Sequence, residues 1–188
     1  MRKQLIEYIK SDLYRYAGAV SFSNFIKYYA RSEGFKFTVW LRMCYFLRMN
    51  RMTKYTLFPL CRLMYFHYKY KFGYDIPYDK IIGPGLLIFH IGGIVFSPES
   101  AGKNVTLSQN TTVGMRIINN EKKFPKIGDN IYIAPGAAII GKVVVGNDVA
   151  IGTNAVVMND VPDHGVVVGI PGKVISFNGA KAYVNNPI

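Results

Sequence analysis

The stretch from Ile127 to Val157 reads IGDNIYIAPGAAIIGKVVVGNDVAIGTNAVV, and its pattern repeats every six residues. One set of apolar residues recurs at this interval: Ile127, Ile133, Ile139, Val145, Ile151 and Val157. A second set of small or branched residues follows four positions after each: Ile131, Ala137, Val143, Val149, Ala155 and Val161. Neither an α-helix nor an alternating strand has this period. The pattern predicts a coil of short flat strands, in which each hexapeptide forms one side of a triangular prism and small residues and glycines occupy the corners.

The same period continues upstream of this stretch. Apolar residues occupy it at Ile82, Ile88 and Ile94 and, after a slip of one residue, at Ala101, Leu107 and Val113. Residues 115–124 lack the period and are polar, which predicts a loop that protrudes from the coil. We therefore expect a helical N-terminal region at residues 1–72, a β-helix at residues 73–178 and a C-terminal tail at residues 179–188.

The N-terminal region has a different composition from the coil. Residues 1–72 contain 14 Lys and Arg against 3 Asp and Glu, a net charge of +11, whereas residues 73–188 contain 9 against 8. The first part also holds 19 aromatic residues against 8 in the second, but only 2 of the 18 glycines. Apolar residues at helical spacing predict a first helix: Leu5, Ile6, Ile9, Leu13 and Tyr16.

Three further helices are expected in this region. Ser21 and Ser23 are both suitable N-caps for the second helix. The third helix covers residues 37–49. The fourth runs over residues 53–70, with Pro59 either early in the helix or at a kink.

Two segments of the coil resemble a known family. The segment YDIPYDKIIGPGLLIFH (residues 74–90) resembles the DIHPxAxIGxGxxxDH segment of left-handed parallel β-helix acyltransferases of the serine acetyltransferase-like branch, with the same fifteen-residue step from Asp75 to His90. The later coils and the closing GIPGKVI (residues 169–175) resemble the same enzymes. The resemblance implies a left-handed coil preceded by helices, acetyl-CoA as co-substrate, and a homotrimer; whether trimers pair into hexamers is left open.

An imidazole and a carboxylate carry the chemistry that the resemblance implies. Moving an acetyl group from a thioester to an alcohol requires a base for the hydroxyl proton, and histidine in general titrates close to neutral pH. His90 lies in the repeat coil, whereas His67 lies in the helical region and His164 in the closing segment. The step from Asp75 is slightly less than one coil, so its carboxylate can return beside the imidazole and orient it. The resemblance implies that His90 is the general base and Asp75 its orienting partner.

The resemblance also implies an acetyl-CoA site, along the crease between neighbouring subunits. It places pantetheine beside Ala134, Gly152 and Thr153, the CoA phosphates near Lys173, and a backbone donor to the tetrahedral intermediate at Gly114.

Neither cysteine is placed to act as a nucleophile. Cys44 and Cys61 lie in apolar stretches without the Cys/His spacing of a zinc site. We expect buried free thiols, no bound metal, and direct attack of the acceptor on acetyl-CoA in a ternary complex.

The acceptor side departs from the serine enzymes. Phe124 stands in place of the histidine of their RHPKI segment, Lys123 in place of its arginine, and Phe89 in place of the acidic residue before the catalytic histidine. A zwitterionic amino acid needs charged partners, whereas aromatic faces suit a sugar ring. We therefore expect an O-acetyltransferase that acts on a glycan or polysaccharide precursor. L-serine is the alternative acceptor, and a non-catalytic β-helix scaffold is the alternative of another class.

The net charge of +12 predicts an anionic partner. Two near-apolar runs, FTVWLRMCYFL (residues 37–47) and YTLFPLCRLMYF (residues 55–66), are too short or too interrupted to span a membrane. With their basic neighbours they fit an anionic membrane surface, and packing between subunits explains them equally well. No motif indicates nucleic-acid binding. The first residues lack a signal-peptide core, so we expect a cytoplasmic protein, either free or at the inner face of the membrane.

Overall fold

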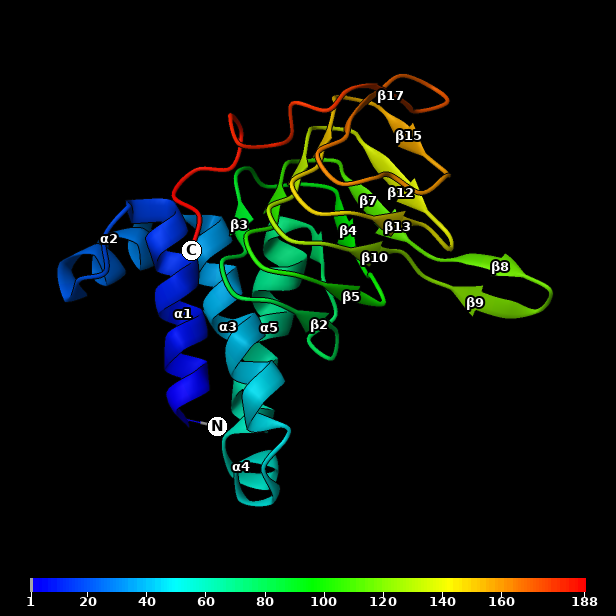
Figure 1. The fold of residues 1–188 in the computed structure, drawn as a ribbon. Coiled ribbons are helices and arrows are strands. Elements are labelled where there is room, and N and C mark those ends of the chain that lie inside the picture. Colours follow the sequence, from blue (N-terminus) through cyan, green and yellow to red (C-terminus); the bar gives the residue numbers. More distant parts are fainter. Residues whose placement is uncertain (1) are drawn as a thin grey trace.

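The computed structural model describes residues 2–188 and shows a group of helices packed against one end and one side of a coil of short strands (Figure 1). The helices are α1 (Arg2–Ala17), α2 (Phe22–Arg31), α3 (Glu33–Leu47), α4 (Arg51–Thr56) and α5 (Phe58–Phe72). Strands begin at Tyr74, directly after the left-handed Gly73 that ends α5.

The helix starts follow from local capping. The hydroxyl of Ser21 accepts a hydrogen bond from the amide of Asn24 at 3.0 Å, which confirms Ser21 as the N-cap of α2. Ser32 caps α3 in the same way, so this helix begins four residues before the predicted start at Phe37. The predicted fourth helix is two helices, because Asn50 caps α4 and Pro59 lies in the first turn of α5 rather than at a kink.

The strands stack into three parallel sheets, one for each side of the prism. The first sheet contains β1 (Tyr74–Asp75), β4 (Ile94–Phe96), β7 (Thr112–Gly114), β12 (Ala138–Ile140) and β15 (Val156–Val157). The second contains β2 (Ile81–Ile82), β5 (Ser100–Ala101), β10 (Lys126–Ile127) and β13 (Val144–Val145). The third contains β3 (Leu87–Ile88), β6 (Thr106–Leu107), β11 (Tyr132–Ile133), β14 (Ala150–Ile151), β16 (Val166–Val168) and the antiparallel β17 (Lys173–Ser176).

The period of six correctly predicted the interior of the coil. Both apolar sets from the 127–157 stretch are buried, and none of their side chains exceeds 4% exposure. Ile127 lies opposite Val145, and Ile133 lies opposite Ile151, eighteen residues apart in each case. The coil is therefore a parallel β-helix, and each hexapeptide contributes two buried side chains to its core instead of one.

Glycine and asparagine have separate roles at the corners. Asparagines at the corners adopt the left-handed conformation; φ is 58° at Asn104, 56° at Asn130 and 57° at Asn154. Gly128 is needed for a different reason: a Cβ there would lie 2.4 Å from the carbonyl oxygen of Gly146 in the next coil. The expectation that small residues and glycines form the tight corners is thus only partly correct, because asparagine supplies much of the left-handed backbone.

The slip in the upstream period lies at the turn that carries His90. Phe96, not Ile94, takes the position aligned with Val113, while Ile94 pairs with Tyr74. The step from Ile88 to Phe96 is therefore eight residues instead of six, and the step from Phe96 to Ala101 is five, which together give the net slip of one residue. The extra residues lengthen the turn between β3 and β4 and carry it outward from the prism.

The polar interruption forms a hairpin. Strands β8 (Arg116–Ile118) and β9 (Glu121–Lys123) pair antiparallel and project from the coil (Figure 1). The tail after β17 runs back along one corner of the coil, where the amide of Ile188 donates to Asn104. It ends beside α1 (Figure 1).

A buried ion pair between α1 and α3 is hydrogen-bonded to the backbone of the first coil. Arg42 of α3 binds both carboxylate oxygens of Asp12 of α1 and donates to the carbonyls of Ile82 and Gly83. Asp12 also accepts from the amide of Leu86 at 2.8 Å. The amphipathic pattern of α1 did not predict this, since Asp12 lies next to Leu13 on the buried face.

Candidate active site

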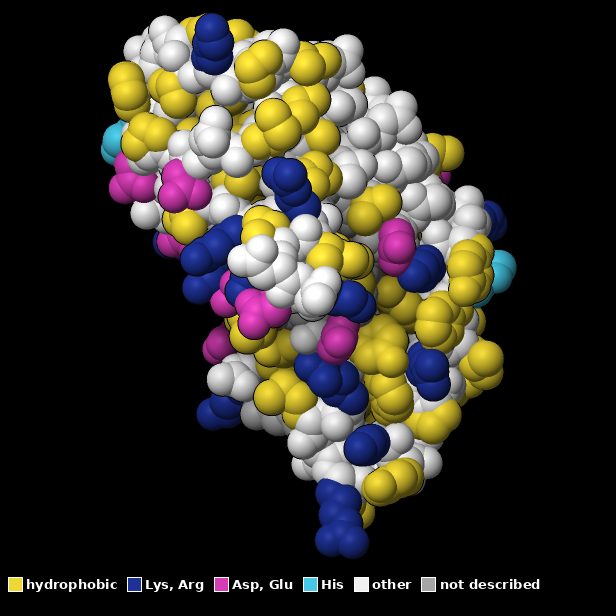
Figure 2. Space-filling view, turned by 90° about the vertical axis from the view of Figure 1, so that its right-hand side faces the viewer, with side chains coloured by type: hydrophobic (Ala, Val, Ile, Leu, Met, Phe, Trp, Pro, Cys, Tyr) yellow, Lys and Arg dark blue, Asp and Glu magenta, His cyan; other side chains and the backbone are white. Residues whose placement is uncertain are grey.

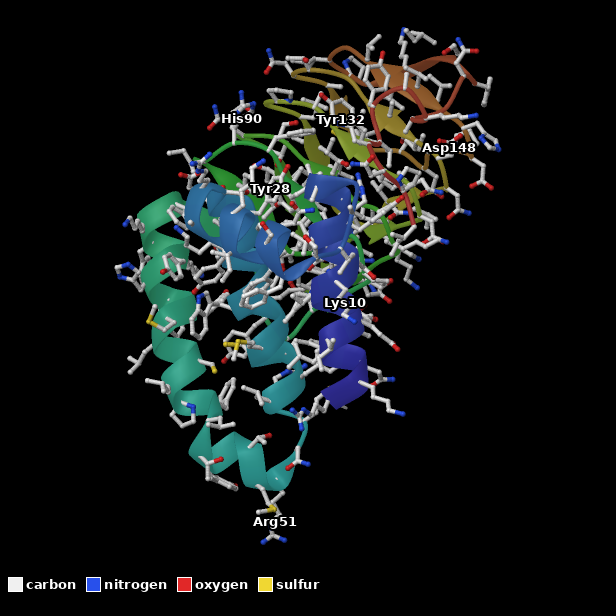
Figure 3. The ribbon with its side chains drawn as sticks, turned by 90° about the vertical axis from the view of Figure 1, so that its left-hand side faces the viewer. Lys10, Tyr28, Arg51, His90, Tyr132 and Asp148 are labelled. Atoms are coloured by element: carbon white, nitrogen blue, oxygen red, sulfur yellow. The ribbon has the colours of Figure 1, made fainter. Side chains whose placement is uncertain are left out.

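His90 lies at the outer edge of the β-helix, in the long turn between β3 and β4 (Figure 3). Its side chain is exposed, and in the described part of the chain the imidazole makes no hydrogen bond. Gly92, with φ of 102°, and Gly93, with φ of 63°, give this turn a backbone that other residues rarely adopt. The imidazole is therefore open to a substrate that approaches from outside the prism.

The turn is held by the junction between α5 and β1. The amide of Gly92 donates to the carbonyl of Phe72 at 2.9 Å, and the amide of Ile94 donates to Gly73 at 3.0 Å. The buried hydroxyl of Tyr74 donates to the carbonyl of His90 at 3.3 Å. Burial raises the pKa of Tyr74 above its usual value, so this phenol stays protonated and remains a donor.

Asp75 lies on the strand next to this turn but is not bonded to His90. It is the second residue of β1 and lies opposite Val95 of β4. Its Oδ1 accepts from Nζ of Lys69 at 2.6 Å, and 55% of its side chain is exposed. Lys69, on the last turn of α5, is a partner that sequence reasoning missed. The structure brings the Asp75 and His90 segments together, while the direct contact between their side chains remains a prediction.

A small cavity lies beside this pair of segments. Its volume is about 280 Å³, and it is lined by residues of α5, β1 and β4: Lys69, Tyr70, Gly73, Tyr74, Asp75, Gly93, Ile94 and Val95. Phe89 and His90 do not line this cavity, and their ring centroids lie 6.2 Å apart. Phe89 is 44% exposed, so it presents a free aromatic face next to the imidazole.

Three residues predicted to contact CoA line one cavity on the third sheet. Ala134, Gly152 and Thr153 border a space of about 300 Å³. The other lining residues come from the sheet, from β17 and from the tail: Tyr132, Ala150, Ile151, Val166, Val168, Ile175 and Tyr183. Lys173 pairs with Val168 at the edge of the sheet and is exposed.

Tyr183 is a lining residue that the sequence did not reveal. It comes from the tail, and its ring stacks on that of Tyr132 with centroids 5.0 Å apart and an angle of 18°. Half of its side chain is exposed. No periodic pattern covers the tail, so only the fold brings this ring to the predicted CoA contacts.

The remaining predicted residues lie elsewhere in the single chain. Gly114 is in β7 of the first sheet, so it does not border the cavity on the third. Lys123 is paired with Glu121 within the hairpin. Phe124 lies under the ammonium group of Lys80, which is 4.0 Å from the ring centroid. The structure therefore does not gather Lys123 and Phe124 around His90 within one chain.

The thiols are unreactive by burial. Cys44 is fully enclosed and Cys61 nearly so, and both are free. Burial raises the pKa of Cys44 to about 12 and also raises that of Cys61, so both stay protonated at neutral pH. No group of metal-ligating side chains occurs within residues 2–188.

The fold and the six-residue repeat together indicate the class of protein. A helical region followed by three stacked parallel sheets with a six-residue period is the fold that this chain shares with solved serine acetyltransferases, which are hexapeptide-repeat proteins. The proteins to which this chain is similar in sequence and in fold are serine acetyltransferases. No family model matches the chain.

Two curated relatives and one solved structure illustrate the similarity. The chain is 35% identical over 133 residues to the serine acetyltransferase of Staphylococcus xylosus, covering 70% of this chain and 62% of that protein. It is 38% identical over 129 residues to that of Bacillus pumilus, covering 68% of this chain and 59% of the relative. The crystal structure of the Neisseria gonorrhoeae serine acetyltransferase matches with a TM-score of 0.74 and 27% identity, over 93% of this chain and 67% of that one. The chain thus spans less than two thirds of the length of these curated relatives and is serine acetyltransferase-like over most of its own length.

Proposed function

We propose that the protein is an acetyl-CoA-dependent O-acetyltransferase whose acceptor is L-serine. The observation that carries this proposal is the similarity to serine acetyltransferases over 133 residues, at 35% identity. The cavity that gathers Ala134, Gly152 and Thr153 also supports it, because the resemblance implies that these residues lie beside pantetheine.

The cavity on the third sheet suits the pantetheine arm of CoA. Its lining is mostly aliphatic and aromatic, with Ala134 and the adjacent Gly152 and Thr153 as its small or polar members. Lys173 at its margin offers a cation to the phosphates. A serine acetyltransferase with this fold, at a TM-score of 0.72, has been solved in complex with CoA.

His90 acts as the general base in the proposed reaction. It takes the proton from the serine hydroxyl as the oxygen attacks the thioester carbonyl carbon. Collapse of the tetrahedral intermediate breaks the carbon–sulfur bond, and the proton passes to the thiolate of CoA. Since Oδ1 of Asp75 is bound to Lys69, orientation of the imidazole falls to Oδ2 of the same carboxylate.

The serine acceptor replaces the glycan expected from the sequence. The expectation of a glycan depended on a free aromatic platform that includes Phe124, but the ammonium group of Lys80 lies 4.0 Å from the centroid of this ring and covers it. The relatives described above are serine acetyltransferases, and none of them supports a role in polysaccharide synthesis.

A homotrimer is the proposed active form. His90 lies on the turn from the third sheet to the first, whereas Phe124 directly precedes β10 of the second sheet. A neighbouring copy can present its second sheet and hairpin to this turn. Exposed apolar side chains on the outer face of the second sheet support such a contact, since Ile81 is 61% exposed and Val144 is 47% exposed.

Release of CoA tests the proposed function. The purified protein is incubated with acetyl-CoA and L-serine, and in parallel with a panel of nucleotide-linked and lipid-linked sugars. We expect CoA release with serine and formation of O-acetylserine, detected by mass spectrometry. Release with a sugar but not with serine would restore the glycan acceptor, and no release with any acceptor would favour a non-catalytic scaffold.

A further inference from the structure

The end of the helical region that lies farthest from the coil exposes many apolar side chains. We call this surface the α4–α5 tip. Its apolar members are each between 53% and 80% exposed: Met49, Met52, Tyr55, Leu57, Leu60 and Leu63. Its exposed basic members are Arg51, Lys54 and Arg62. A cluster of this kind is unusual on a surface that contacts only water.

The tip is also uniformly positive. Residues 34–74 contain eight Lys and Arg and no Asp or Glu. At the lower end of the molecule in Figure 2, where α4 lies, basic and hydrophobic side chains occur together without acidic ones. Arg42 and Lys69 are paired with Asp12 and Asp75 outside this range, whereas Arg51, Lys54 and Arg62 of the tip make no ion pair within residues 2–188. The charge of the tip therefore favours an anionic partner.

This charge argues against contact between two copies of the tip. A symmetric contact would bring Arg51, Lys54 and Arg62 of each copy towards the same residues of the other, and residues 34–74 hold no carboxylate to separate them. Like charges in a partly dehydrated contact repel each other. The apolar residues are therefore better matched by a surface that is itself anionic.

The tip is free to approach a flat surface. Figure 3 shows Arg51 at the far end of the helices, with His90 at the opposite end of the molecule. Within residues 2–188, no helix is both long enough and apolar enough to cross a bilayer. The run at residues 37–47 cannot contribute, because α3 is the buried centre of the helical region and Leu41, Cys44 and Phe46 are enclosed.

Two cations of the tip lie against aromatic rings. Nζ of Lys54 lies 5.8 Å from the ring centroid of Tyr55. The guanidinium of Arg62 lies 5.2 Å from the ring of Phe66. Tyrosine and basic side chains in this mixture are typical of helices that lie in the headgroup region, with apolar residues below and cations at the phosphates.

We propose that the α4–α5 tip binds peripherally to an anionic lipid surface. Met52, Leu60 and Leu63 enter the boundary between headgroups and acyl chains, while Arg51, Lys54 and Arg62 contact lipid phosphates. The attachment leaves the CoA cavity and the His90 turn exposed, since both lie on the coil. It is independent of which acceptor the enzyme uses.

Co-sedimentation with vesicles tests this attachment. The full chain is mixed at low salt with vesicles of phosphatidylglycerol and phosphatidylcholine, or of phosphatidylcholine alone. We expect binding to the first kind only, and a loss of binding as salt rises, because the attraction is screened.

Paired variants identify the surface. Arg51→Gln with Lys54→Gln should lower the partition coefficient by about 30-fold, since each basic residue contributes about 1 kcal/mol. Leu60→Ser with Leu63→Ser should lower it as well, through the apolar part of the contact. The matched control is Lys142→Gln with Phe177→Ser, which removes an exposed cation and an exposed ring on the coil and should bind like the wild type. Acetyltransferase activity without vesicles should be unchanged in the tip variants.

Three outcomes overturn the proposal. The wild type could remain wholly in the supernatant with anionic vesicles at low salt. The Arg51→Gln, Lys54→Gln variant could bind as well as the control pair. Finally, the wild type could fail to bind vesicles while the tip variants show a changed oligomeric state when measured by light scattering. This result would identify the surface as a contact between copies.

Discussion

At the scale of single residues, His90 combines an exposed imidazole with a firmly held backbone. Tyr74, Gly92 and Ile94 fix the turn through hydrogen bonds to or from its main chain and its neighbours. The side chain itself contributes little to this framework, so its removal should affect catalysis far more than folding.

His90→Ala should lower kcat by about 10²- to 10⁴-fold, the usual contribution of a general base. Steady-state CoA release with serine measures this. His67→Ala is the matched control, because His67 is an exposed histidine on α5 away from the turn. Near wild-type turnover in His90→Ala would show that another group removes the proton.

Asp75→Asn should lower kcat by less than His90→Ala, because it removes orientation rather than the base. The double variant should be no slower than His90→Ala alone, since a residue that acts through another has no effect once that other is gone. Additive losses would show that Asp75 has a role of its own. Lys69→Met, as a control, should cost less than tenfold, because the Lys69–Asp75 pair is partly exposed and such pairs contribute about 1 kcal/mol or less.

At the scale of elements, the stacking of coils depends on glycines that allow close approach. Gly128 faces the carbonyl of Gly146 with no room for a methyl group. Gly128→Ala should therefore lower the free energy of unfolding by roughly 1–3 kcal/mol, as overpacking does. Gly114→Ala is the control, because its nearest neighbour would lie 3.8 Å from the new Cβ. Equal urea midpoints for the two variants would contradict this account of the stacking.

The tail acts as one wall of the proposed CoA site. Tyr183→Ala removes a ring that stacks on Tyr132, and such pairs contribute about 0.5–1.5 kcal/mol. We expect the KM for acetyl-CoA to rise roughly threefold to tenfold, with the KM for serine and kcat unchanged. Tyr183→Phe should retain the wild-type value. An increase in the KM for serine alone would place the tail at the acceptor site instead.

At the scale of the whole molecule, the helical region and the β-helix are joined by buried charge. The side chains of Arg42 and Asp12 are 3% and 1% exposed, and Arg42 also caps the carbonyls of the first coil. Arg15 makes a second joint, donating to Gly85, Thr106 and the tail. Burial lowers the pKa of Arg15 to about 10, which still leaves it charged at neutral pH.

Arg42→Met should destabilise the protein by about 3–5 kcal/mol, because it leaves the Asp12 carboxylate buried without its cation. Urea unfolding followed by circular dichroism measures the change. Lys126→Met serves as the control, since the Lys126–Glu99 pair is 55% exposed on both sides and should contribute about 1 kcal/mol or less. Similar losses in both variants would mean that the helices are held mainly by apolar packing.

The sequence predicted most of the coil and less of the site. Residues such as Ile133 and Ile151 were placed inside correctly, because each repeat puts the same position inward and the rule is local. The same holds for Ser21, whose capping bond spans three residues. The grouping of Ala134 with Gly152 followed from a resemblance plus the eighteen-residue turn.

What the sequence could not determine depends on contacts between segments far apart in the chain. The partner of Asp75 is Lys69 because α5 ends beside β1, and the partner of Asp12 is Arg42 because α1 and α3 pack together. Tyr183 reaches the CoA cavity only because the tail folds back over the third sheet.

By itself, the sequence determined the β-helix, its inward residues and the charge of the helical region, since period and composition are properties of the chain alone. Tertiary structure decided which of the two apolar runs is exposed: residues 37–47 pack into the centre of the helices, and the α4–α5 tip remains uncovered. It also decided that Phe124 lies under Lys80 rather than beside His90. The physical reason is that apolar and aromatic segments of similar composition look alike in the sequence, and only the packing of distant segments determines which of them is buried.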